Sequence, residues 1–454
     1  MHKNLARSAP AAVPLHMVTA RDCKAFLAAA QARAGLAACG FAGREGELLP
    51  LTAGGKVTGW VLGLGAGNEP FAAAAFAEKL PGGVYRLGEA PALQGGANAA
   101  LAWLLGTYAF TRYKSAKKKT PRLVLPAGVD GEETSRVAEA VFLARDLVNT
   151  PANDMGPAEL AAAGRKLAAA HGAKIGVIKG ASLKRGFPLI EAVGRGSPRP
   201  PCLIDLTWGK PNAPRVTLVG KGVCFDSGGL DIKPSSGMLP LPQALGGAAE
   251  ALAIAAMVMG AKLNLRLRVL IPAVENSVSG DAFRPGDVFK SRKGLTVEIG
   301  NTDAEGRLIL ADALALADED KPELLIDIAT LTGAARAATG MELPPFFTDD
   351  EPLAAALMRH GAAESDPVWR LPLWRGYEST LDSPIADITN NPHYGYAGAI
   401  TAALFRNRFG ERAKSWLHLD IAAWTDRPRP GRKTGGEATA GRALYALLKQ
   451  RYGR

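Results

Sequence analysis

The chain has 454 residues, of which 47% are hydrophobic and 21% are charged. This length exceeds the size at which one hydrophobic core usually stops growing, so we expect two domains, and the composition excludes a wholly disordered chain. The net charge of +11 indicates either an ordinary basic surface or an anionic partner such as nucleic acid; basic residues spread along the chain favour the first interpretation.

The N-terminus and the cysteines bear on location. Lys3 and Arg7 precede an apolar stretch, but Pro10 and Pro14 interrupt it, so this stretch makes a poor signal peptide. No apolar run approaches the length of a membrane span. The four cysteines lack C-x-x-C spacing, which fits a reducing compartment. We therefore expect a cytoplasmic protein without a membrane partner.

The first elements predict a small α/β domain over residues 1–130. Residues 60–63 favour a strand, and the alanine-rich residues 71–79 favour a helix. The sequence GLGAG at residues 63–67 lacks the spacing and the acidic partner of a dinucleotide site, so it predicts a turn at the end of the strand. The charged run KSAKKKTP at residues 114–121 predicts a solvated loop, with a nucleic-acid tether as the weaker alternative.

A larger domain is expected over residues 131–454, and a helix at about residues 132–147 should bridge into it. Beyond this helix, strand-like apolar runs alternate with helices, at residues 215–223, 246–260, 266–273, 308–317 and 324–331. The alternation predicts an α/β fold of two domains, the larger with a mixed, largely parallel central sheet. Its functional site should lie at the carboxyl ends of the strands.

The motif NTDAEGRL at residues 301–308 is the densest chemical signal. It follows a predicted strand at residues 295–299 and opens a predicted helix. On such a turn, Asp303 and Glu305 can point into one small volume that backbone oxygens also face, and hard cations prefer oxygen clusters of this kind. Helix capping would explain Asp303 but not the pair.

A second motif, VGKGVCFDSGG, covers residues 219–229 and is followed by IKP at residues 232–234. A strand would deliver Lys221 and Asp226 to its end, where the glycines let the backbone turn back closely. Taken alone, two lysines near acids favour ordinary ion pairs. The chemical interpretation depends on both motifs being present.

With both motifs present, the chain resembles the leucyl aminopeptidase (cytosol aminopeptidase) family from about residue 140 to residue 445. Further matching segments are NTPAN at 149–153, RPGDV at 284–288, TLTGA at 330–334, HLDIA at 418–422 and GGEAT at 435–439. The resemblance implies a hydrolase, a metalloprotease that releases N-terminal amino acids from peptides, and a homohexamer.

The resemblance also implies two divalent metal ions, zinc or manganese, bound by Lys221, Asp226, Asp303 and Glu305. Asp226 and Glu305 would bridge both ions, and Lys221 would be an unusual neutral amine ligand. Paired metals of this kind activate a water and polarise the peptide carbonyl.

Further roles follow from the same resemblance. Lys233 would stabilise the oxyanion, and Arg307 would hold a bicarbonate ion that serves as the general base. The substrate cleft would be lined by Asn301, Thr330, Leu331 and Gly333, and Leu241 would border the side-chain pocket.

One metal ligand of the family is replaced. The family's segment D-M-G-G-A corresponds here to ALGGA at residues 244–248, so Ala244 stands where an aspartate should bind metal. The preceding PLPQ at residues 240–243 also departs from the family's lysine-containing run. In the family this aspartate shares its metal with the lysine amine, so we expect the second site, beside Lys221, to be weakened.

Two other functions stay open. A catalytically silent relative could act as a binding or regulatory protein, for which the net charge keeps nucleic acid as a candidate partner. The sequence DSGG at residues 226–229 resembles the nucleophile segment of trypsin-like serine proteases, but that mechanism needs a histidine base and an acid. His418, between two leucines, is instead expected to be a buried structural residue.

Overall fold

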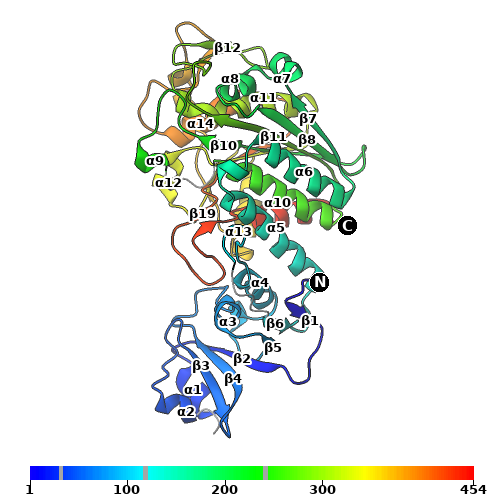
Figure 1. Ribbon diagram of the computed structural model, residues 1–454, viewed down its shortest axis with the longest axis vertical. Coiled ribbons are helices and arrows are strands. Elements are labelled where there is room, and N and C mark those ends of the chain that lie inside the picture. The colour runs from blue at the N-terminus through cyan, green and yellow to red at the C-terminus, as the bar shows by residue number, and fades with distance from the viewer. Residues whose placement is uncertain (30–33, 116–120, 239–243, 454) are drawn as a thin grey trace. The chain divides into compact units, whose positions relative to one another are not determined.

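The computed structural model describes residues 1–29, 34–115, 121–238 and 244–453. Its contacts divide the chain into two units: unit 1 contains Met1–Phe142 and Arg427–Thr434, and unit 2 contains Leu143–Asp426 and Gly435–Arg454. Figure 1 labels the elements of both units. Within the described ranges, no helix combines the length and the apolar character needed to cross a membrane.

Unit 1 is built on a six-stranded sheet whose neighbouring strands are all parallel except β3 and β4. In sheet order the strands are β1 (Leu5–Ala6), β6 (Pro121–Val124), β5 (Gly83–Leu87), β2 (Val13–Val18), β4 (Lys56–Gly63) and β3 (Leu48–Ala53). The helices are α1 (Cys23–Ala28), α2 (Ala34–Ala38), α3 (Ala74–Lys79) and α4 (Gly96–Gly106). Phe76 of α3 and Trp103 of α4 are fully buried in its main core, because both helices carry apolar side chains toward the sheet.

The predictions for this region hold with shifted boundaries. The strand predicted at residues 60–63 is the end of β4, and the helix predicted at residues 71–79 begins three residues later, at Ala74. The glycine-rich segment after β4 is the predicted turn, with φ of +57° at Gly65 and +78° at Gly67. Of the predicted loop at residues 114–121, residues 116–120 lie outside the described part of the chain, and its last residue, the proline, already starts β6.

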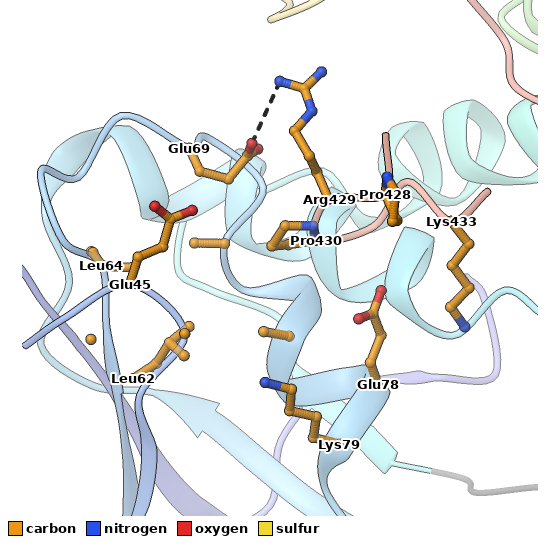
Figure 2. Close-up of a pocket in the computed structure, with 14 residues that line it drawn as sticks. Glu45, Leu62, Leu64, Glu69, Glu78, Lys79, Pro428, Arg429, Pro430 and Lys433 are labelled. Carbon is orange, nitrogen blue, oxygen red and sulfur yellow. Dashed lines mark ion pairs between the residues drawn. The ribbon is translucent and has the colours of Figure 1, made fainter. Parts of the chain in front are cut away.

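A pocket of about 560 Å³ opens beside this turn within unit 1 (Figure 2). Leu62 and Leu64 line one side, and the segment 428–433 lines another. Its polar lining mixes both charges, and the Arg429 guanidinium pairs with Glu69 across 3.9 Å. None of the lining residues is a predicted site residue, so the chemistry indicated by the sequence lies in unit 2.

Unit 2 contains a nine-stranded mixed sheet. Along the main path the strands are β16 (Trp369–Arg370), β15 (Pro345–Phe347), β18 (Trp416–Asp420), β14 (Leu324–Ala329), β9 (Arg215–Gly220), β11 (Arg266–Asn276), β8 (Cys202–Trp208) and β7 (Lys174–Lys179), and β10 (Gly222–Asp226) pairs with β11. The central neighbours β18, β14, β9 and β11 are parallel, whereas β8 joins β11 antiparallel. The predicted α/β fold with a mixed, largely parallel central sheet is thus confirmed.

Helices cover both faces of this sheet (Figure 1). One face carries α11 (Glu305–Glu319), α8 (Pro188–Gly194) and α14 (Gly398–Asn407), and the other carries α10 (Gly246–Gly260), α6 (Pro157–His171) and α15 (Gly441–Tyr452). The remaining longer helices are α5 (Gly131–Asn149), which contains the helix predicted at residues 132–147, and α13 (Glu351–Ala363). Helix α10 is hydrophobic almost all round and is accordingly buried along nearly its whole length.

The strand predicted at residues 215–223 is wrong in one respect, because two strands, β9 and β10, meet at Lys221. Glycines permit this break: a Cβ on Gly220 would lie 2.7 Å from the Gly247 carbonyl oxygen, and one on Gly222 would lie 2.6 Å from the Pro272 carbonyl oxygen. Lys221 is thereby placed near the carboxyl ends of the central strands, at the edge where the other predicted site residues gather.

The acidic motif at residues 301–308 connects a small sheet to helix α11. The small sheet consists of β12 (Val288–Lys290), β13 (Thr296–Glu298) and β17 (Ile388–Thr389), and β13 ends shortly before the motif in the chain. The chain then forms a 3-10 turn at Thr302–Ala304 and enters α11 at Glu305. Helix α11 therefore begins three residues earlier than the sequence predicts, which places Glu305 in its first turn.

Candidate metal centre

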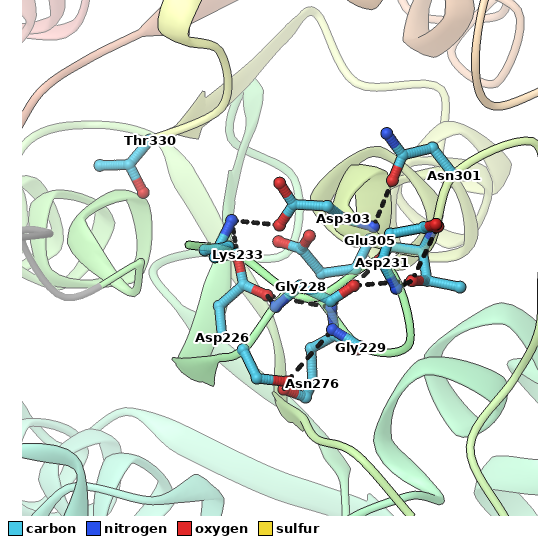
Figure 3. A network of polar contacts seen from close by, with 12 residues as sticks. Asp226, Gly228, Gly229, Asp231, Lys233, Asn276, Asn301, Asp303, Glu305 and Thr330 are labelled. Atoms are coloured by element: carbon cyan, nitrogen blue, oxygen red, sulfur yellow. Dashed lines mark hydrogen bonds and ion pairs between the residues drawn. The ribbon is translucent and has the colours of Figure 1, made fainter. Parts of the chain in front are cut away.

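Three carboxylates converge at the carboxyl end of β10 and the start of α11 (Figure 3). Asp226, Asp303 and Glu305 each offer one oxygen, and these oxygens lie within 4.8 Å of one another. The Glu305 side chain is only 1% exposed; its Oε1 faces the Lys221 amine at 2.9 Å, and its Oε2 has no hydrogen-bond partner among the described residues. Burial, and next Asp226, raise the pKa of Glu305 to about 7. A buried carboxylate beside two partly buried ones fits a divalent cation, which would supply a partner for Oε2 of Glu305.

The backbone after β10 positions Asp226. Its Oδ1 accepts hydrogen bonds from the Gly228 N–H at 2.9 Å and from the Asn276 side-chain amide at 3.0 Å. A Cβ on Gly228, where φ is +88°, would lie 2.3 Å from the Asp231 carbonyl oxygen, so this tight turn requires glycine. One carboxylate oxygen is thus used for positioning, and the other, Oδ2, lies 3.1 Å from the Lys233 amine.

Side chains outside the two sequence motifs tie the acidic motif in place. Asp231 accepts from the Thr302 N–H at 2.7 Å, and the Thr302 hydroxyl donates to the Gly228 carbonyl at 2.6 Å, which joins both motifs. Asn390 accepts from the N–H groups of Gly300 and Asn301 at 2.8 and 3.2 Å. These supporting residues were not predicted from the sequence. Only Asp231 lies next to a predicted motif, between residues 219–229 and residues 232–234.

Asn301 caps the turn itself. Its side-chain Oδ1 accepts from the Asp303 N–H at 2.7 Å, which leaves the Asp303 carboxylate free of the capping role that helix statistics would give it. Figure 3 shows Asn301 beside Asp303, on the outer side of the cluster.

Two lysines lie against the carboxylates. The Lys221 Nζ atom donates to the Thr330 carbonyl at 3.0 Å and lies 2.9 Å from Oε1 of Glu305. The Lys233 Nζ atom lies 3.1 Å from Asp226 and also contacts Asp303. Burial opposes the charge on Lys233, but its two carboxylate partners outweigh burial and raise the pKa of its ammonium. The structure therefore places both predicted lysines at the centre.

Gly306 explains how Lys221 reaches the cluster. A Cβ at this position would lie 2.7 Å from the Lys221 Cε atom and 2.9 Å from the Leu331 side chain. The lysine stem and Leu331 thus pack directly over the first turn of α11, and any larger residue would displace them.

Ala244, which the family resemblance predicts to replace a metal ligand, belongs to the same neighbourhood. The Thr330 hydroxyl donates to the Ala244 carbonyl at 3.1 Å, while the Thr330 carbonyl accepts from Lys221. Ala244 is half-buried and packs against the core of unit 2. Leu241 belongs to residues 239–243, which lie outside the described part of the chain.

The remaining predicted residues that the structure describes come from α11 and from the segment after β14. Arg307 donates to the Asn390 carbonyl at 2.7 Å, and burial together with the neighbouring Arg406 lowers the pKa of Arg307 to about 10. The Leu331 N–H donates to Asp420 at 2.9 Å. Gly333 opens α12 (Gly333–Thr339), and a Cβ added there would meet nothing within 4 Å, so its surface faces open space.

Ser227 and His418 do not form a catalytic pair. The Ser227 hydroxyl donates to the Asn276 carbonyl at 3.1 Å and accepts from the Gly229 N–H. His418 is fully buried on β18, where its Nδ1 lies 2.7 Å from Asp327. The expectation that His418 is a buried structural residue is confirmed.

Known proteins resemble the chain over nearly its full length. The model for the cytosol aminopeptidase family, catalytic domain, matches residues 142–447, and the model for the M17 aminopeptidase N-terminal domain matches residues 13–126. A probable cytosol aminopeptidase of Roseiflexus castenholzii is 42% identical over 366 residues, which cover 76% of this chain and 74% of the relative.

Two solved structures share the fold. The crystal structure of the cytosol aminopeptidase from Coxiella burnetii is 43% identical, with a TM-score of 0.93 and 98% of each chain covered. The bottromycin maturation enzyme BotP in complex with Mn is 34% identical, with a TM-score of 0.87, and the match covers 98% of this chain and 100% of that one.

Proposed function

The chain belongs to the cytosol aminopeptidase family and is a metal-dependent aminopeptidase, and from this premise we propose that Asp226, Asp303 and Glu305 hold its catalytic cation. The carboxylate cluster carries this proposal, since three ligand oxygens lie within 4.8 Å of one another and Oε2 of the buried Glu305 has no hydrogen-bond partner among the described residues. The alternatives of a silent binding protein and of a serine mechanism gain no support from this geometry.

A divalent cation supplies an activated water and polarises the peptide carbonyl when it is bound. Lys233, held between two of the carboxylates, is suited to stabilise the oxyanion that develops on the substrate. Arg307 is a partly buried cation suited to hold an anion such as bicarbonate, the proposed general base. The proposed cleft lies over Asn301, Thr330, Leu331 and Gly333, with Leu241 included from the family resemblance alone.

We propose zinc or manganese as the metal. The related BotP structure is a complex with Mn, and the oxygen ligands here suit manganese, whereas zinc accepts the same carboxylates. The family pattern provides two metal positions, and the second, beside Lys221, is the weaker one here because Ala244 has no ligand atom in its side chain.

Finer properties follow from the family. We propose that the enzyme assembles as a homohexamer and works in the cytoplasm on peptides with a free N-terminus. The positive net charge keeps nucleic acid as a secondary candidate partner, although no particular surface of the described residues favours it.

Hydrolysis of leucine amide and of its N-acetylated form, with Mn²⁺ or Zn²⁺ added, tests the function. We expect release of leucine from the free amide only, loss of release after chelation, and recovery with fresh metal. Cleavage of the acetylated compound, or turnover that survives chelation, would overturn the proposal.

A further inference from the structure

We propose that this chain holds a single divalent cation, on Asp226, Asp303 and Glu305, and that Lys221 remains the ion-pair partner of Glu305 at the place of the family's second cation. The inference rests on the proposed metal centre and changes its stoichiometry. It follows from three observations: the surroundings of Ala244, the contacts of Lys221 and the charge of the cluster.

Ala244 lies in the shell around Lys221, so its chemistry bears on that position. Thr330 connects the two residues, because its carbonyl accepts from Lys221 at 3.0 Å and its hydroxyl donates to the Ala244 carbonyl at 3.1 Å. By the family resemblance, residue 244 should carry a carboxylate, whereas the alanine here has no side-chain ligand atom and packs against the core of unit 2. The backbone oxygen of Ala244 accepts the Thr330 hydroxyl and carries no negative charge that could replace the carboxylate.

Lys221 is engaged as a hydrogen-bond donor. Its side chain is 5% exposed, its Nζ donates to the Thr330 carbonyl, and the same atom lies 2.9 Å from Glu305. The amine thus faces one carboxylate and one carbonyl, which are the contacts of an ion-pair partner. Gly306 and Leu331 pack against the lysine stem and hold the amine in this position.

The charge of the buried cluster selects the same stoichiometry. With Lys221 and Lys233 both counted as cations, three carboxylates and one divalent cation already leave one positive charge in excess. A second divalent cation would add two further positive charges, which the family's aspartate would partly offset and Ala244 does not. Because uncompensated charge is expensive in a buried site, the second cation is disfavoured here while the first is not.

The first experiment counts Mn²⁺ bound to the intact protein after equilibration and removal of free metal, and records its electron paramagnetic resonance spectrum. We expect about one equivalent per chain, with the spectrum of an isolated Mn²⁺ ion. About two equivalents, with the spectrum of an exchange-coupled pair, would overturn the proposal.

Substitution at the replaced ligand supplies the matched comparison. Ala244→Asp should raise the count to about two and produce the coupled spectrum, whereas Ala244→Asn, of the same size without the charge, should stay at about one. If Ala244→Asp unfolds at a lower temperature than the parent, the family sequence is introduced over residues 240–245 as a block. A block variant that is folded and still binds one Mn²⁺ would contradict the charge argument.

Lys221→Met distinguishes an ion-pair partner from a metal ligand by the direction in which Mn²⁺ affinity changes, since a thioether is a poor ligand for Mn²⁺. If Lys221 is an ion-pair partner, removing its positive charge should tighten Mn²⁺ binding by about tenfold or more. If it is a ligand, the same change should weaken binding. Lys293→Met, which removes a lysine paired with Glu411, should leave the affinity unchanged.

Metal binding is measured without substrate, so the two proposals fail separately. A protein that binds two Mn²⁺ ions and hydrolyses leucine amide refutes the single cation but keeps the proposed function. A protein that binds one Mn²⁺ ion and leaves leucine amide intact keeps the single cation and refutes the function.

Discussion

Asn390 and Asn301 form a reciprocal contact across 89 residues of sequence: Oδ1 of Asn390 accepts from the Asn301 N–H at 3.2 Å, and Nδ2 of Asn390 donates to the Asn301 carbonyl at 2.8 Å. Asn390 is fully buried. One side chain therefore fixes the strand-to-turn backbone from which Asp303 and Glu305 project.

Replacing Asn390 by alanine should disturb the metal centre without touching a ligand. The change leaves backbone groups of Gly300 and Asn301 unpaired, so we expect a loss of about 1–3 kcal/mol in the free energy of unfolding. We also expect Mn²⁺ affinity to fall about 10- to 100-fold, as for other residues that orient metal ligands. Denaturant unfolding and Mn²⁺ titration measure both effects. The exposed neighbour Asn391, changed to alanine, is the control, and equal Mn²⁺ affinities in the two variants would contradict this role.

Asp303→Asn and Glu305→Gln should each lower leucine amide turnover by more than about a thousandfold, because both residues act through the metal and the water it activates. The fold should persist, since each change keeps the side chain's size. Turnover and thermal unfolding are compared with Glu298→Gln, a carboxylate on β13 that instead accepts from Ser383. Turnover like that of the parent protein in either site variant would refute the assignment of the cluster.

Lys233→Ala should separate rate from metal content. The loss of one oxyanion donor typically lowers kcat by about 100- to 1000-fold. Metal binding should persist or tighten, because the change removes a cation that lies 3.1 Å from Asp226. Kinetics and metal analysis of the same preparation provide the test. A collapse of metal content would show that Lys233 and Lys221 have been given the wrong roles.

The buried His418 should make the free energy of unfolding fall in acid. Burial, and next Arg406, lower the pKa of His418 below its ordinary 6.5, so the unfolded chain binds a proton more readily than the folded one. Stability from this group is present above about pH 6.5 and is lost as the pH falls, by up to about 1.4 kcal/mol per pH unit.

His418→Asn should flatten that dependence, because an amide can donate to Asp327 but does not titrate. Unfolding free energies are compared from about pH 7 to about pH 5, with the exposed His393→Asn as the control. Identical pH profiles for His418→Asn and the parent would contradict the prediction.

The sequence predicts the parts of this molecule that depend on local pattern. Alternating apolar runs indicate the parallel centre of the sheet, and α10 has the predicted bounds, residues 246–260. The acids of the NTDAEGRL motif were found by their spacing, because a strand-to-helix turn places such residues together whatever the rest of the chain does. His418 was found by its apolar neighbours.

Features that depend on contacts between distant segments could not be predicted from the sequence. The break between β9 and β10 at Lys221 depends on close approach of Gly220 and Gly222 to segments far along the chain. Asn390 has no pattern of its own, and its role arises only when β17 pairs with β13. The antiparallel strands β8 and β7 were not predicted at all, and β7 is only partly buried.

Anomalous diffraction from crystals grown with Mn²⁺, recorded at the manganese absorption edge, tests the central claim most directly. The account predicts a single peak bounded by the carboxylates of Asp226, Asp303 and Glu305, with Lys221 still paired to Glu305. A second peak of similar height beside Lys221 would contradict the single cation, and the lack of any peak at the three carboxylates would contradict the metal centre itself.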